Sequence, residues 1–162
     1  MSNRFLWGFI IALIAWIGVF TVAYLYFASA QAPKVAMVSA DSPEKEIIIP
    51  RSLDGHYYVQ GKINGYPVEF MVDTGASIVS ISYELARAIH LPPGIPANFS
   101  TAGGGVNGEI VPSVDIEIGN IRLNELTVSV GIQGKMALLG QNFLRRIDMI
   151  QSNDKMILQI RN

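Results

Sequence analysis

The sequence predicts an all-β domain with one or two short helices, preceded by a single transmembrane helix. Residues 5–27 contain no charged side chain. Beyond residue 50, short runs rich in β-branched and aromatic residues alternate with turn residues roughly every 8–12 positions, as in β-barrels and sandwiches. The chain has 162 residues, which leaves enough length after the apolar segment for one ordinary hydrophobic core.

Residues 1–27 form the predicted membrane anchor. As a helix, Phe5–Phe27 would be roughly 34 Å long at about 1.5 Å per residue, which is enough to cross a bilayer core. Ala28-Ser29-Ala30 is similar to a signal-peptide cleavage site, but a signal peptide has a shorter apolar region of about 7–15 residues. Cleavage after Ala30 stays open. Arg4 precedes the run, so the positive-inside rule predicts a cytoplasmic amino terminus. We therefore expect a single-pass inner-membrane protein whose folded domain is periplasmic.

Residues 28–50 are expected to be a linker, because they contain three prolines and show no sustained periodicity before Ile47. The folded domain is then expected over residues 51–162. Its first half predicts a hairpin, because Asn64-Gly65 separates two apolar runs and is the strongest short hairpin signal. The other elements expected in this half are a strand over Ile78–Ile81 and a helix from Tyr83 to about His90, capped by Ser82. The two hairpin strands are His56–Ile63 and Tyr66–Val72.

The second half of the domain is also expected to be mostly strands. The glycine-rich segment Gly103–Gly108 is expected to be a mobile tip, and Pro112 predicts an edge strand or a bulge. Gln141–Arg146 is expected to form one or two helical turns. The strands expected here are Ala97–Ala102, Glu109–Ile118, Ile121–Val130, Met136–Leu139, Ile147–Gln151 and Lys155–Ile160.

The composition excludes several classes of function. Twelve basic and thirteen acidic residues give a net charge of −1 without a basic stripe, so no nucleic-acid partner is expected. The chain has no cysteine, which excludes disulfides and thiolate chemistry. The two isolated histidines, His56 and His90, argue against a histidine-rich metal site. No metal or organic cofactor is expected.

The segment Phe70–Ser77 carries the sharpest chemical signal. Asp73 directly follows an apolar strand, and Thr74 and Gly75 come next. Glycine permits a tight turn and the close approach of another backbone, and the threonine hydroxyl can brace a loop by hydrogen bonds. An ordinary turn between two strands has the same composition. Ser77 and Ser80 lack plausible histidine and aspartate partners for a serine triad.

This stretch resembles the active-site loop of the aspartic proteases, in which a hydrophobic strand leads into Asp-Thr/Ser-Gly. Residues 136–144 resemble the second hallmark of that family, two hydrophobic residues and a glycine before a short helix. The two motifs are about 65 residues apart, similar to the spacing in the single-domain retroviral-type members. The resemblance is strongest to bacterial, membrane-anchored retropepsin-like proteins with an Asp-Thr-Gly-Ala-Ser signature.

The resemblance implies a retropepsin-like acid-protease β-barrel and peptide or protein substrates. It implies that Asp73 is the catalytic residue and that its neighbours bind substrate or support the loop; these are Thr74, Gly75, Ala76 and Ser77. It implies a flap that closes over the substrate, formed by Gly103, Gly104, Gly105, Val106, Asn107 and Gly108. It also implies that the second motif, Leu138, Leu139 and Gly140, lies beneath the active-site loop.

The single Asp-Thr-Gly triplet predicts a homodimer. Aspartic proteases use two carboxylates that share one proton, because like charges about 3 Å apart cannot both ionise. This chain holds one copy of the motif, so the second carboxylate is expected from Asp73 of another copy across a two-fold axis. The alternative is a non-catalytic dimeric binding or scaffold domain with the same fold.

Overall fold

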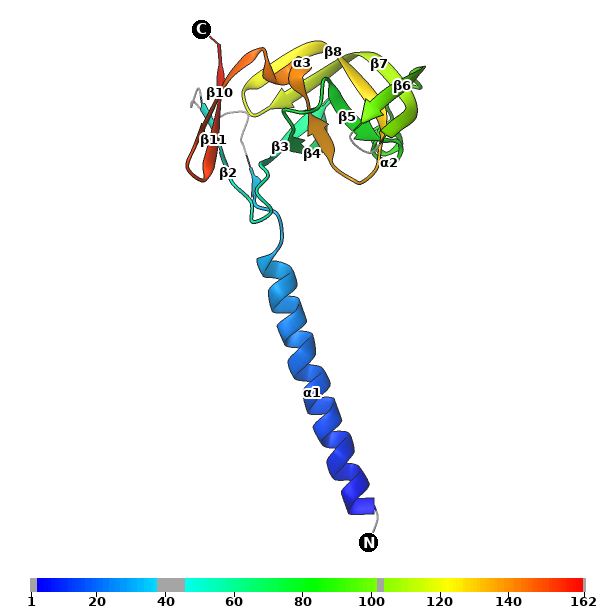
Figure 1. Cartoon of the computed structure of the whole chain (residues 1–162), viewed down its shortest axis with the longest axis vertical. Helices are drawn as coiled ribbons and strands as arrows, with labels where there is room; N and C mark the ends of the chain where they lie inside the picture. Colours follow the sequence, from blue (N-terminus) through cyan, green and yellow to red (C-terminus); the bar gives the residue numbers. More distant parts are fainter. Residues whose placement is uncertain (1–2, 38–45, 102–103, 162) are drawn as a thin grey trace. The chain divides into compact units, whose positions relative to one another are not determined.

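The computed structural model describes residues 3–37, 46–101 and 104–161, which are drawn in colour in Figure 1. The chain divides into two compact units, Met1–Pro33 and Lys34–Asn162. The first unit consists of helix α1, Asn3–Ala30, as the apolar run predicts. Within it, Trp7–Ala30 has a mean hydropathy of 2.3. By length and composition this helix could be a membrane span or a signal sequence.

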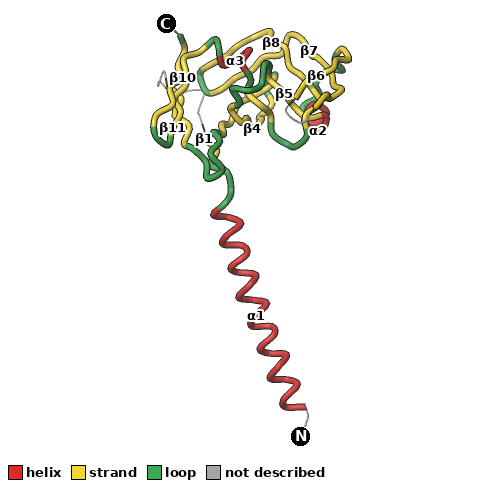
Figure 2. Tube along the Cα trace, in the orientation of Figure 1, coloured by secondary structure: helices red, strands yellow, loops and turns green. Residues whose placement is uncertain are grey.

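The second unit is built almost entirely of strands, with two short helices (Figure 2). The all-β prediction is therefore confirmed. The helices are α2, Tyr83–Ala88, and α3, Gln141–Leu144. The strands are β1 Val35–Ala36, β2 Glu46–Pro50, β3 Tyr58–Ile63, β4 Tyr66–Val72, β5 Val79–Ser82, β6 Ile95–Thr101, β7 Gly104–Ile118, β8 Ile121–Ile132, β9 Ala137–Leu139, β10 Ile147–Ser152 and β11 Lys155–Ile160.

The larger sheet closes into a barrel. Its strand order is β1-β3-β4-β9-β5-β8-β7-β6, and a further pairing joins β3 to β7. In that pairing Lys62 lies opposite Glu117 and Ile63 lies opposite Ile116. The ring β3-β4-β9-β5-β8-β7 therefore has no free edge. The smaller sheet has the order β10-β11-β2.

Local signals in the sequence set several of these elements. Asn64 and Gly65 both have positive φ, 48° and 83°, as a two-residue hairpin turn requires, and β3 pairs antiparallel with β4 around them. The Ser82 hydroxyl accepts a hydrogen bond from the Leu85 N–H and caps α2. Helix α2 ends two residues before the expected position, and His90 adopts a left-handed φ of 55°.

Two expectations are corrected by the strand pairing. The segment expected to be a linker contains β1 and β2, because β1 pairs with β3 and β2 pairs with β11, over a hundred residues away. Residues 38–45 of that segment lie outside the described residues. The glycine-rich segment is not a tip from Gly104 onward, because Gly104–Gly108 begin β7 and pair with β6. Gly103 lies outside the described residues.

The proline in β7 marks a bulge rather than an edge. The register between β7 and β8 shifts between Val111 and Val114, and Ser113 between them has a φ of 57°. Strand β7 lies between β6 and β8, so it is not an edge strand. The missing N–H of Pro112 is accommodated by this local break in the ladder.

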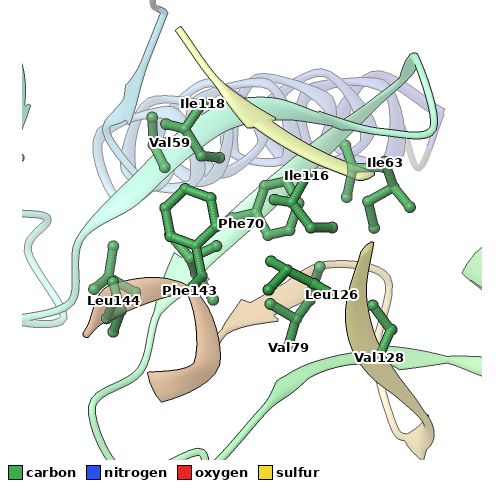
Figure 3. Packing of buried hydrophobic residues seen from close by; sticks show 14 of the residues in the cluster. Val59, Ile63, Phe70, Val79, Ile116, Ile118, Leu126, Val128, Phe143 and Leu144 are labelled. Atoms are coloured by element: carbon green, nitrogen blue, oxygen red, sulfur yellow. The ribbon is translucent and has the colours of Figure 1, made fainter. Parts of the chain in front are cut away.

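The hydrophobic core fills the barrel and continues under the smaller sheet. Figure 3 shows the side chains of Phe70, from β4, and Phe143, from α3, in this core. Both are fully buried. Ile47, Ile49 and Leu158 extend the same cluster from the smaller sheet. Because β4 and α3 share this core, the strand before Asp73 and the helix after the second motif are held together by apolar packing.

Candidate active site

The structure brings the two sequence motifs side by side. Asp73 directly follows β4, and β9 carries the hydrophobic part of the second motif. The two strands are parallel neighbours, with Val72 opposite Leu139. The Asp73 N–H donates to the Leu139 carbonyl at 3.2 Å. The first residue beyond β4 is therefore fixed by a strand that follows it by some 65 positions in the chain.

Hydrogen bonds within the Asp73 loop orient its carboxylate. The Gly75 N–H donates to Asp73 Oδ1 at 2.8 Å, and the Ala76 N–H donates to the Asp73 carbonyl at 3.3 Å. A Cβ at Gly75 would lie 3.2 Å from Asp73 Oδ1, which is tight for a side-chain contact. Glycine at this position therefore leaves room for the carboxylate to accept the backbone hydrogen bond.

Helix α3 holds the same loop through three hydrogen bonds. The Gln141 N–H donates to the Ala76 carbonyl at 2.8 Å, and the Asn142 N–H donates to the Ser77 carbonyl at 3.1 Å. The Gln141 side chain donates to the Thr74 carbonyl at 2.9 Å. These three bonds satisfy the carbonyls of three residues in a loop that has no strand partner there.

Gly140 permits the close contact between the two motifs. A Cβ at Gly140 would overlap the carbonyl group of Ile78. Gly140 is buried, and its carbonyl accepts hydrogen bonds from the Phe143 and Leu144 N–H groups. The glycine is thus required by close packing of α3 against the segment before β5.

The Asn142 side chain joins β5 to β8 and was not singled out in the sequence. It is 8% exposed. Its Oδ1 accepts from the Val79 N–H at 2.9 Å, and its Nδ2 donates to the Thr127 carbonyl at 2.7 Å. A buried amide with both a donor and an acceptor is suited to bridging two backbone groups.

A cleft of about 890 Å³ opens beside the Asp73 carboxylate. Its walls come from the Asp73 loop, from β5, from the β6–β7 hairpin, and from the end of β8 and the residues after it. The lining residues are Asp73, Gly75, Ala76, Ser77, Ile78, Ser80, Asn98, Phe99, Ser100, Val106, Ser129, Gly131, Ile132, Gln133 and Leu138.

The expected site residues divide into two groups. Six of them line the cleft: Asp73, Gly75, Ala76, Ser77, Val106 and Leu138. The others described by the structure support it or lie elsewhere. Thr74 contributes its carbonyl to the contact with Gln141, Leu139 and Gly140 are buried behind the loop, and Gly104, Gly105, Asn107 and Gly108 form the start of β7.

Sequence reasoning did not identify the cleft residues on β6 and β8. Asn98, Phe99 and Ser100 come from β6, and Ser129 comes from β8. The available signal was weak: Ser129 lies between Val128 and Val130 in β8, and Ser80 lies between Val79 and Ile81 in β5. Over residues 3–37, 46–101 and 104–161, no three histidine or acidic side chains gather as they would around a metal ion.

Comparisons with known proteins agree with this geometry. Residues 59–146 match the family model described as "gag-polyprotein putative aspartyl protease". The chain belongs to this family. The matched range includes both the Asp73 loop and the second motif, so the resemblance inferred from these motifs is confirmed.

The fold is shared with a solved member of the retropepsin-like aspartic proteases. The crystal structure of a retropepsin-like aspartic protease from Rickettsia conorii matches with a TM-score of 0.62 and 29% identity, over 71% of this chain and 90% of that one. The predicted retropepsin-like barrel is therefore confirmed.

Two curated relatives are uncharacterized proteins. One, in the cobV 5′ region of a Sinorhizobium species, is 32% identical over 74% of this chain and 54% of its own length. The other, from Rickettsia prowazekii, is 48% identical over 27% of this chain and 19% of its own length. The chain thus spans about half the length of the first relative and a fifth of the second.

Proposed function

We propose that the chain is an aspartic endopeptidase that acts as a homodimer, with Asp73 of each copy in one active site. The observation that carries the proposal is the position of Asp73. Asp73 lines the cleft, and its carboxylate Oδ1 accepts a hydrogen bond from the Gly75 N–H at 2.8 Å. A fixed carboxylate next to a groove is what general acid–base catalysis on a bound peptide requires.

The proposed chemistry needs two carboxylates and one shared proton. One Asp73 carboxylate removes a proton from a water molecule, and that water attacks the carbonyl carbon of the scissile peptide bond. The other, protonated, Asp73 donates a hydrogen bond and then its proton to the carbonyl oxygen. The first Asp73 then gives the proton it took from water to the amine nitrogen, the second Asp73 takes a hydroxyl proton back from the intermediate, and the C–N bond breaks to leave an acid and an amine with the shared proton restored.

The composition of the cleft supports a dimer. Among the described residues that line it, Asp73 is the sole acidic side chain. A second carboxylate therefore has to come from another molecule, and a two-fold axis next to Asp73 supplies an identical one. Gly75 and Ala76 would then line the substrate groove. The β6–β7 hairpin, with Gly103–Gly108, would cover the bound peptide.

The test is peptide cleavage by the full chain in non-ionic detergent. Asp73→Asn should abolish cleavage of a peptide library while the protein keeps its fold. Asp154→Asn is the matched control, because Asp154 is exposed in the turn between β10 and β11. If Asp73→Asn cleaves the same bonds at the wild-type rate, the aspartic mechanism is wrong and the scaffold alternative gains support.

Mixing the wild-type chain with Asp73→Asn tests whether two chains share one active site. With a ninefold excess of Asp73→Asn, random exchange leaves about a tenth of the wild-type chains in fully active dimers. Activity per wild-type chain should therefore fall to about a tenth, provided that subunits exchange. Unchanged activity, with exchange verified by mass spectrometry of isotope-labelled chains, would show that one copy holds a complete site.

We further propose that α1 remains in the inner membrane and that the folded domain is periplasmic. The support is the apolar length of Trp7–Ala30 and the basic residue Arg4 before it. Membrane-bound protein that begins at or near Met1 is expected. Soluble protein that begins at Gln31 would show that the helix is a signal sequence.

A further inference from the structure

Two largely buried serines lie together in the cleft wall. Ser80 and Ser129 are direct partners in the parallel pairing of β5 and β8. Their neighbours in the same ladder, Val79 with Val128 and Ile81 with Val130, are all buried and apolar. Ser80 is 8% exposed and Ser129 is 6% exposed, yet both line the cleft.

The hydrogen bonds of the pair leave the Ser129 hydroxyl oxygen able to accept a hydrogen bond from a ligand in the cleft. The Ser129 hydroxyl donates to Ser80 Oγ at 2.7 Å, and the Ser80 hydroxyl donates to the Ile78 carbonyl at 3.0 Å. Both hydroxyl protons are therefore used within the protein. A hydroxyl oxygen has two acceptor lone pairs, and no described residue donates to Ser129 Oγ.

We propose that Ser80 and Ser129 form the floor of a specificity pocket that accepts a short, uncharged substrate side chain with a hydrogen-bond donor, foremost asparagine. This inference rests on the proposed peptidase function and names the substrate side chain that the cleft selects. The side-chain amide of asparagine can donate to Ser129 Oγ. Ile78 and Leu138, which also line the cleft, contact its aliphatic part.

Other side chains fit the floor of this pocket less well. Leucine nearly matches asparagine in shape but would leave Ser129 Oγ desolvated without a donor. Aspartate would place a charged acceptor against the hydroxyl oxygens. A lysine or arginine would find no carboxylate here besides Asp73 of the catalytic loop, and a buried unpaired charge is costly.

The test compares asparagine, leucine and aspartate at each position of a peptide library. Cleavage by the full chain in detergent is one readout. Retention of peptides by the immobilised Asp73→Asn chain, followed by mass spectrometry, is the second readout and requires no catalysis. At one peptide position, asparagine should be favoured over leucine roughly tenfold, the effect of one net hydrogen bond, and aspartate should be rejected more strongly.

Variants of the pair separate substrate selection from structural support. Ser129→Ala should remove the preference for asparagine over leucine in both readouts, and Ser129→Thr, which keeps a hydroxyl, should retain it. Ser52→Ala is the matched control. Ser52 is also a buried serine, but its hydroxyl oxygen accepts a hydrogen bond from the Lys34 backbone N–H outside the cleft. Loss of the Ser52 hydroxyl should therefore leave the preference for asparagine intact.

The outcomes distinguish this inference from the proposed function. Cleavage without an asparagine preference, or with a preference that survives Ser129→Ala, overturns the pocket and leaves the peptidase standing. Retention that favours asparagine and depends on Ser129, without any cleavage by the wild-type chain, supports the pocket and overturns the peptidase.

Discussion

Replacing Asn142 by alanine should strongly destabilise the folded domain. The substitution removes the partner of the Val79 N–H, bonded at 2.9 Å, and of the Thr127 carbonyl, bonded at 2.7 Å. Val79 is fully buried, so water cannot replace the lost acceptor without a local opening. An unsatisfied buried group costs about 1–3 kcal/mol. The half-buried Thr127 carbonyl adds less, which gives a total loss of about 2–4 kcal/mol.

The assay is urea unfolding of residues 34–162, followed by far-ultraviolet circular dichroism at one fixed protein concentration, because dimer formation makes stability concentration-dependent. Gln141→Ala is the matched control. It removes one side-chain hydrogen bond to the Thr74 carbonyl at a solvent-accessible position, so its expected cost is about 0.5 kcal/mol.

The hydrogen exchange of the Val79 amide tests the cause directly. Relative to wild type, Asn142→Ala should accelerate exchange of this amide more than that of amides in β10 and β11, because the Asn142 side chain bonds to Val79 and Thr127 and not to those strands. A loss of stability below about 0.5 kcal/mol, or one equal to that of Gln141→Ala, would refute the assignment of Asn142 as the link between β5 and β8.

Two further changes have effects that follow from single contacts. Gly140→Ala should destabilise the domain by about 1–3 kcal/mol, because the new Cβ overlaps the Ile78 carbonyl. Gly105→Ala is the control: a Cβ there meets nothing within 4 Å, so the substitution should be neutral in the same unfolding assay. Burial, and then the hydrogen bond from its hydroxyl to Asp54, raises the pKa of Tyr58 to about 12 from a reference of 10.0. The folded state thus holds this proton more tightly than the unfolded state, so the stabilisation is present below pH 10 and is lost toward pH 12. Tyr58→Phe should flatten the fall in unfolding free energy between pH 10 and about 12. An unchanged fall would show that other groups cause it.

The parts of the fold that could be predicted from sequence are those with a local cause. Asn64-Gly65 forces a hairpin because both residues adopt positive φ. Ser82 caps α2 through a hydrogen bond to a residue three positions away. The Asp73 loop can be recognised because its motif consists of consecutive residues, Asp73, Thr74 and Gly75. In each case the stabilising contact lies within a few positions of the signal.

Contacts between distant segments were not predictable from one sequence. The isoleucines of β2 are apolar enough for a strand, but their partner β11 comes a hundred residues later, and nothing local indicates that pairing. Gly104–Gly108 have loop-like composition, yet the ladder to β6 overrides that preference. The register that places Ser80 opposite Ser129 arises from a parallel pairing, so two unremarkable serines became a pair only in the folded chain.

The hydrogen bonds that hold the Asp73 loop come from the same copy of the chain, so the order of this loop should not depend on dimer formation. The hydrogen bonds to the backbone of residues 73–77 come from within the loop and from β9 and α3. A monomer should therefore keep its carboxylate oriented while holding half of the site. On dilution, activity per chain should fall with the dimer population measured by ultracentrifugation, whereas hydrogen exchange of residues 73–78 should stay constant. If the loop instead loses protection from hydrogen exchange in parallel with activity, the partner chain orders the loop. Activity would then depend on the dimer because the loop folds only there, and not because the monomer lacks a second carboxylate.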